Sequence, residues 1–84
     1  MADRKEIGKI AHYFDHIGVA VVELSGTLKK GDKVLIEGGT TSIEQTAESI
    51  QIDKKPVASA GKGQSIGMKV SERVREGDKV YKLM

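Results

Sequence analysis

Apolar and polar residues alternate along several short segments of this chain. Because successive side chains of a β-strand point to opposite faces, such alternation predicts strands with one face buried. The strongest segment is residues 18–24, which is rich in β-branched residues and is interrupted only by Glu23. The predicted strands are residues 6–14, 18–24, 33–37, 66–70 and 80–83, with a long β-rich segment at residues 40–53. The predicted core consists of Val22, Leu24, Val34, Ile36, Ile66, Met68 and Val70.

The alternation is interrupted within the long β-rich segment. Ile43 and Ala47 have one parity, whereas Ile50 and Ile52 have the other. A shift of one residue moves every later side chain to the opposite face, so a bulge or a break is predicted near residues 47–49. A helix over residues 43–50 is the alternative, but Thr40, Thr41 and Thr46 disfavour a helix and strand signals lie on both sides.

The tetrapeptide Gly-Asp-Lys-Val occurs twice, at residues 31–34 and 77–80. In both places charged residues precede it and an apolar run follows it. Gly and Asp tolerate the backbone angles that a tight turn requires. We therefore predict that Gly31 and Gly77 occupy equivalent turns, each leading into a strand. Pro56, which lacks an N–H group, predicts a loop or a sheet edge.

Length and composition indicate a small globular protein. The 84 residues are 38% hydrophobic and 31% charged, which predicts a single domain over residues 1–84 with an ordered core of about residues 6–83. The absence of Cys excludes a disulfide framework and a thiolate metal site. The sequence has neither a long apolar segment nor a secretory signal, so we expect a cytoplasmic protein without a membrane partner.

The net charge of +2 is too small to indicate nucleic-acid binding by itself. The basic residues nevertheless cluster near predicted turns, and the turns of a small barrel gather at its ends. One interpretation is a basic end that binds RNA phosphates. The other is that lysines keep loops and edges solvated. The candidate RNA-binding residues are Lys29, Lys30, Lys54, Lys55, Lys62 and Arg75.

The candidate catalytic and metal-binding patterns are weak. His12 and His16 have a spacing that can hold a metal on a helix, but they span a strand end and a turn and have no third ligand. His12 shares a predicted apolar side with Ile10 and Phe14, which indicates a core or interface residue. Residues 60–65 resemble a phosphate-binding loop only loosely, because the order of Gly and Lys is wrong. We found no triad, and a filled small barrel has no cleft for paired carboxylates. We therefore predict a non-enzymatic protein with no catalytic residues, cofactor or metal.

The strand and turn motifs follow one another in a specific order. They are Ile7-Gly8-Lys9-Ile10, Gly18 to Val22, Gly26 to Ile36, Ala60 to Val70 and Val74 to Val80. This order resembles the second domain of translational GTPases of the elongation factor Tu type, and it is most similar to small stand-alone translation elongation factor-like proteins. It is also similar to a C-terminal barrel of some collagenase-like peptidases. The resemblance implies a six-stranded closed β-barrel of Greek-key type.

The resemblance also implies a function, by analogy of fold. The chain would be a non-enzymatic module of translation that binds RNA or a ribonucleoprotein through its basic loop end, with tRNA or the ribosome as partner. No nucleotide hydrolysis is expected. The alternative is a protein-interaction barrel with a protein partner, serving a separately encoded enzyme such as a collagenase-like peptidase.

Overall fold

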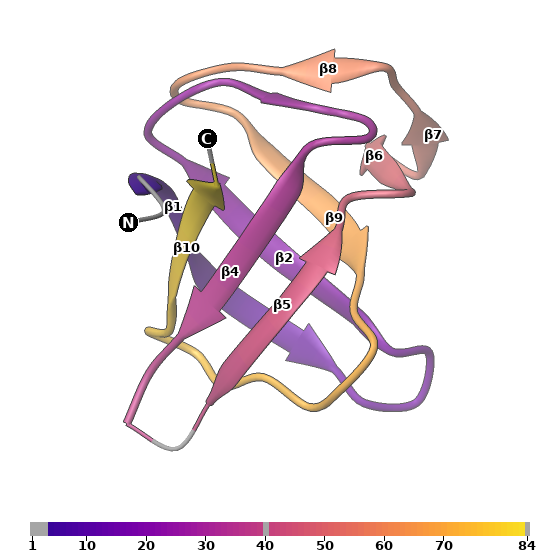
Figure 1. The fold of residues 1–84 in the computed structure, drawn as a ribbon. Helices are drawn as coiled ribbons and strands as arrows, with labels where there is room; N and C mark the ends of the chain where they lie inside the picture. Colours follow the sequence, from indigo (N-terminus) through magenta and orange to yellow (C-terminus); the bar gives the residue numbers. More distant parts are fainter. Residues whose placement is uncertain (1–3, 40, 84) are drawn as a thin grey trace.

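The computed structural model describes residues 4–39 and 41–83, and the regular structure in this part of the chain is entirely β-strand (Figure 1). This confirms the predicted all-β class, and the helical alternative around Ala47 is wrong. Thr40, the first residue of the predicted segment 40–53, lies outside the described residues, as do residues 1–3 and 84 of the predicted domain. The strands are β1 (Arg4–Phe14), β2 (Val19–Leu24), β3 (Leu28–Lys29), β4 (Lys33–Glu37), β5 (Ser42–Thr46), β6 (Ile50–Ile52), β7 (Lys55–Pro56), β8 (Ser59–Ala60), β9 (Ser65–Lys69) and β10 (Lys79–Leu83).

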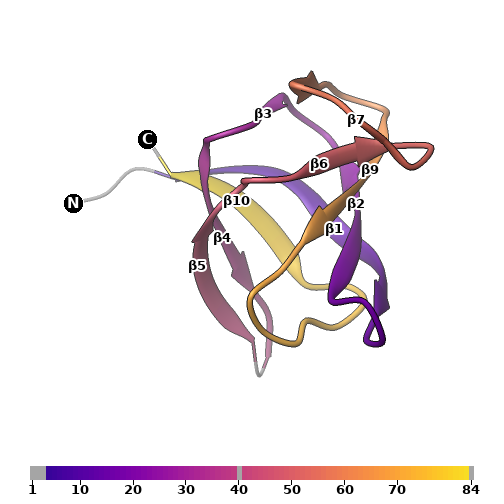
Figure 2. The ribbon, with the colours of Figure 1, turned by 90° about the vertical axis from the view of Figure 1, so that its right-hand side faces the viewer.

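Eight of these strands form one antiparallel sheet in the order β5-β4-β10-β1-β2-β9-β6-β7. The sheet curls strongly, so that β4 and β5 face β2 and β9 across the core (Figures 1 and 2). The short strands β3 and β8 pair with each other and cover one end of the curled sheet. Pro56 lies in β7 at the edge of the sheet, as predicted from its missing N–H group.

The prediction of a six-stranded closed barrel is wrong. Strands β5 and β7 are the two outer strands of the sheet, and within residues 4–39 and 41–83 no backbone ladder joins β5 to β9. The chain turns away after β5, so β6 takes the place beside β9. The side-chain amide of Gln45 spans part of the opening. Its Nε2 donates to the Lys69 carbonyl oxygen at 2.9 Å, and its Oε1 accepts from the Ser71 N–H group at 2.9 Å.

All seven predicted core side chains are buried. Their exposed fractions range from 0% for Ile36 to 7% for Val70. The predicted break near residues 47–49 is also confirmed, because it separates β5 from β6. The break allows Ile43 and Ile50, which have opposite parities, to reach the same core.

The turns at Gly31 and Gly77 are equivalent, as predicted. Their φ angles are 97° and 92°, a region that favours glycine. In each turn the following aspartate, Asp32 or Asp78, donates its N–H group to the carbonyl oxygen three residues earlier, at 3.0 and 3.1 Å. Each aspartate side chain also accepts a backbone N–H hydrogen bond of 2.9 Å. The repeated tetrapeptide therefore builds the same turn twice.

A register shift in β1 places its C-terminal half differently from our prediction. The ladder between β1 and β2 shifts between Ile10 and His12. A bulge of one residue moves the following side chains to the opposite face. Ile10 therefore lies in the core, whereas His12 and Phe14 point outward. The predicted common apolar side of these three residues is wrong for this reason.

Candidate interaction surfaces

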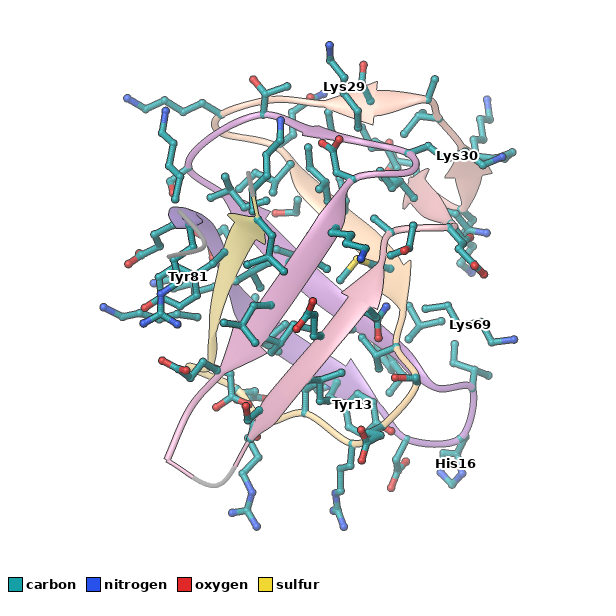
Figure 3. All side chains as sticks on the ribbon, viewed as in Figure 1. Tyr13, His16, Lys29, Lys30, Lys69 and Tyr81 are labelled. Carbon is teal, nitrogen blue, oxygen red and sulfur yellow. The ribbon has the colours of Figure 1, made fainter. Side chains whose placement is uncertain are left out.

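Five of the six candidate RNA-binding residues lie at one end of the molecule. Lys29 and Lys30 lie at and just after β3, as Figure 3 shows at the top of the view. The other three belong to the β6–β7 turn, β7 and the loop after β8, at the same end (Figure 1). All five side chains are exposed. Asp32 of the adjacent turn forms a 3.3 Å ion pair with Lys82, so these two charges offset each other.

Arg75 lies at the opposite end, so the structure does not bring the six residues together. It belongs to the second Gly-Asp turn, which precedes β10. Strand β4 runs from the turn of Gly31 to Gly38, and a side chain at Gly38 would clash with Asp78 of the second turn. The two turns therefore lie at opposite ends of β4. The position of the other five residues, all lysines, does not test whether they contact a binding partner, so this role stays a prediction.

The two histidines lie on the surface. His12 Nδ1 lies 2.9 Å from Glu76 Oε2, and His16 Nε2 lies 3.7 Å from Asp15 Oδ1. Of the two predicted placements of His12, core and interface, the core placement is wrong, because the β1 bulge turns the side chain outward. Among the residues that the structure describes, no group of three or more His, Cys, Asp or Glu side chains could hold a metal ion.

The loop that loosely resembles a phosphate-binding loop is a tight turn between β8, which pairs with β3, and β9, which belongs to the large sheet. Gly61 donates its N–H group to Gln64 Oε1 at 2.8 Å, and Gln64 donates its N–H group to the Gly61 carbonyl oxygen at 3.1 Å.

Over residues 4–39 and 41–83, no helix is long and apolar enough to cross a membrane.

A groove of about 510 Å³ lies on the outer surface of β2 and β9. The β1–β2 hairpin forms one wall and the β6–β7 turn forms the other, and Figure 2 shows these two loops on the same side of the molecule. We call it the Gly67 groove. It is lined by Phe14, Ile17, Val19 and Val21 from β1 and β2 and the hairpin between them, by Ser65, Ile66 and Gly67 of β9, and by Gln51, Asp53 and Lys54 of β6 and the turn after it.

The sequence prediction missed this groove, although one signal pointed to it. Val19 and Val21 have the parity opposite to the buried Val22, so the strand has apolar side chains on both faces. We used this pattern only to predict a buried strand. Phe14 could not be assigned to the surface without knowledge of the β1 bulge.

A second hollow, of about 350 Å³, lies at the opening between β5 and β9. Most of the residues that line it are of polar types, and it has no aromatic or isoleucine side chain like those of the Gly67 groove. It includes Gln45, Thr46, Glu48, Ser49, Lys69, Val70 and Ser71.

Comparison with curated proteins links the chain to larger peptidases. It is 44% identical over 79 residues to a protein of Methanocaldococcus jannaschii named as an uncharacterized protease, a match over 93% of this chain and 19% of that protein. It is also 44% identical over 78 residues to a collagenase of Porphyromonas gingivalis, over 90% of this chain and 22% of that protein. The chain thus spans about a fifth of the length of these relatives. No family model matches it.

Solved structures share the fold. The C-terminal domain of a putative U32 peptidase from Geobacillus thermoleovorans superposes with a TM-score of 0.87, at 21% identity, over 93% of this chain and 91% of that chain. The selenomethionine variant of that domain gives a TM-score of 0.86 at 20% identity.

These findings correct the proposed translational resemblance. The relatives are named as a protease and a collagenase, and the structural neighbours are peptidase domains. The identification with translation elongation factor-like proteins, and the RNA-binding function that followed from it, are therefore wrong. Our motifs lay in turns and core strands, which report a fold more than a partner. The second resemblance, to the C-terminal barrel of collagenase-like peptidases, agrees with the comparisons: this chain has the fold of the C-terminal domain of a U32 peptidase.

Proposed function

We propose that this chain is a non-catalytic interaction domain that serves a collagenase-like peptidase. The observation that carries the proposal is the extent of the similarity. The chain matches a protease and a collagenase at 44% identity over nine-tenths of its own length, but over only about a fifth of theirs. Such a segment is a separable part of a larger peptidase, and the larger remainder has room for the catalytic site.

The surface of the chain supports a binding role. The Gly67 groove has an apolar wall, formed by Phe14, Ile17 and two valines. An apolar wall of this kind suits contact with apolar side chains of another protein. Bond cleavage, by contrast, requires a nucleophile, a general base or a metal held in place. We therefore assign the catalytic chemistry to the peptidase and the binding to this chain.

The test uses the Porphyromonas gingivalis collagenase without its matching region, which we call the collagenase body. We expect the purified 84-residue chain to bind this body with a dissociation constant of roughly 10 µM or tighter, as for transient protein interfaces. Isothermal titration calorimetry measures the binding. Cleavage of labelled collagen is measured for the chain alone, the body alone and the mixture.

We expect no cleavage by the chain alone and faster cleavage by the mixture than by the body alone. Collagen cleavage by the purified chain would show that it is itself an enzyme. Failure of the chain to bind the body would contradict its role as an accessory domain.

A further inference from the structure

The two most exposed large apolar side chains of the described residues lie beside the same groove. Phe14 is 45% exposed and Ile17 is 64% exposed. A single exposed apolar side chain is ordinary, but adjacent ones beside a concavity indicate a contact surface. Val19 and Val21 extend this apolar surface along β2 to Gly67, which is opposite Val21 in the ladder.

Gly67 leaves the groove open, although the backbone does not require a glycine there. A Cβ atom at Gly67 would meet Val19 Cγ1 at 3.4 Å, which is ordinary van der Waals contact. At Gly8, by contrast, a Cβ atom would lie 2.6 Å from the Glu23 carbonyl oxygen. Glycine in the interior of a strand weakens the strand, and it often marks a place where another molecule approaches closely. The position is therefore explained better by an occupant of the groove than by the fold.

The second wall of the groove is a tight turn in an unusual conformation. Asp53 and Lys54 connect β6 to β7, and their φ angles are 52° and 66°. Asn-Gly and Asp-Gly are preferred in two-residue hairpin turns of this kind. Non-glycine residues in such conformations cluster at sites where a ligand is clamped. The conformation also places an acidic and a basic side chain at the edge of the groove, on the same side as Gln51, which is opposite Gly67 in the β6–β9 ladder.

From these observations we propose that the Gly67 groove binds the peptidase body, and that its occupant is an apolar side chain of that body seated over Gly67. The inference rests on the proposed function. The relatives carry about four-fifths of their length outside the matching region, so this fold has a large body as its partner within one polypeptide. Contacts between such parts combine apolar and polar surface, as the lining of this groove does.

The experiment measures binding of the full chain and its variants to the collagenase body defined above. Ile17→Asp places a charge beside the groove, and Gly67→Leu fills it. Ser42→Asp is the matched control, since it adds the same charge at an exposed site on β5, an outer strand of the sheet. We expect each groove variant to weaken binding by about tenfold or more, as at the centre of an interface. The control should change binding by less than about twofold, as for an ordinary surface site.

The outcomes separate the groove from the proposed function. If the unmodified chain binds and both groove variants bind equally well, the groove proposal is wrong and the proposed function stands. If the unmodified chain does not bind, both are wrong. If the chain alone is a dimer that Ile17→Asp dissociates in size-exclusion chromatography, the occupant is a second copy and the proposal is overturned. Circular dichroism establishes that each variant is folded, and two independent variants prevent one unfolded protein from deciding the result.

Discussion

The outer surface of the sheet is very different over its two halves. Over β1, β10 and β4, the Arg4 guanidinium lies 4.6 Å from the centre of the Tyr81 ring and 3.3 Å from Glu37 Oε2. Lys79 Nζ lies 3.5 Å from Glu6 Oε1 on the same surface. Over the middle of β2 and β9, the outward residues are Val19, Val21 and Gly67, flanked by the exposed Phe14 and Ile17, and the polar Glu23, Ser65 and Lys69 lie at the strand ends.

The difference lies in whether the outward side chains find partners within the chain. Over β1, β10 and β4, long charged side chains pair with one another and cover the sheet. Over β2 and β9 the apolar surface is left uncovered, and only contact with another molecule can remove it from water. The first surface is thus complete within the chain, whereas the second is suited to a partner. The following predictions test this comparison.

The largest expected effect tests whether both halves are equally rigid behind their outer surfaces. Ile36→Ala removes a core side chain behind the charged half, and Ile66→Ala removes one behind the Gly67 groove; they are 0% and 1% exposed. Each substitution should lower the free energy of unfolding by about 2–5 kcal/mol, measured by urea denaturation. If the loss for Ile66→Ala is below about 0.5 kcal/mol, as at surface sites, the groove has no rigid support and the comparison fails.

A smaller effect tests whether Gly67 is retained for binding. Gly67→Ala should raise the free energy of unfolding by roughly 0.5–1 kcal/mol, because alanine restricts the unfolded chain and fits the native backbone. Thermal denaturation measures the change. Gly8→Ala is the matched control and should destabilise the protein, since its Cβ atom would lie 2.6 Å from a carbonyl oxygen. Destabilisation by Gly67→Ala would show that the fold itself requires this glycine.

The smallest effect concerns the charged half. Arg4→Ala removes the contacts with Tyr81 and Glu37, but these side chains are about half exposed, and solvent screens such pairs. We expect a loss of less than about 1 kcal/mol that decreases further at high salt. Lys5→Ala on the same strand is the control. A loss above roughly 2 kcal/mol would show that the charged surface holds the sheet together, in contrast to typical exposed pairs.

The sequence predicted those parts of the fold that depend on local patterns. Strict alternation in β4 and β9 identified Ile36, Ile66 and Met68 as core residues. The repeated Gly-Asp pairs identified two equivalent turns, because the positive φ angles of the glycines are a local requirement. The change of parity after Ala47 identified the break between β5 and β6.

The remaining features depend on contacts between distant segments. The β1 bulge adds one residue opposite β2, and nothing in the residues around Ala11 distinguishes it from regular alternation. The opening of the sheet depends on whether β5 or β6 pairs with β9, a choice between segments that both have suitable patterns. The Gly67 groove requires both features, since the bulge exposes Phe14 and the placement of β6 supplies the second wall.

The position of β10 has a consequence for the order of folding. This strand, formed by residues 79–83, lies between β4 and β1, and it alone joins the β5–β4 pair to the rest of the large sheet. Without this strand, the large sheet separates into two parts, the pair β5–β4 and the five strands β1, β2, β9, β6 and β7. The pairing of β10 with β1 joins residues that are far apart in the sequence. All-β proteins dominated by such contacts fold in milliseconds to seconds. We therefore expect the large sheet to be completed only when β10 docks, because a chain that stops at Asp78 lacks the strand that joins β4 to β1.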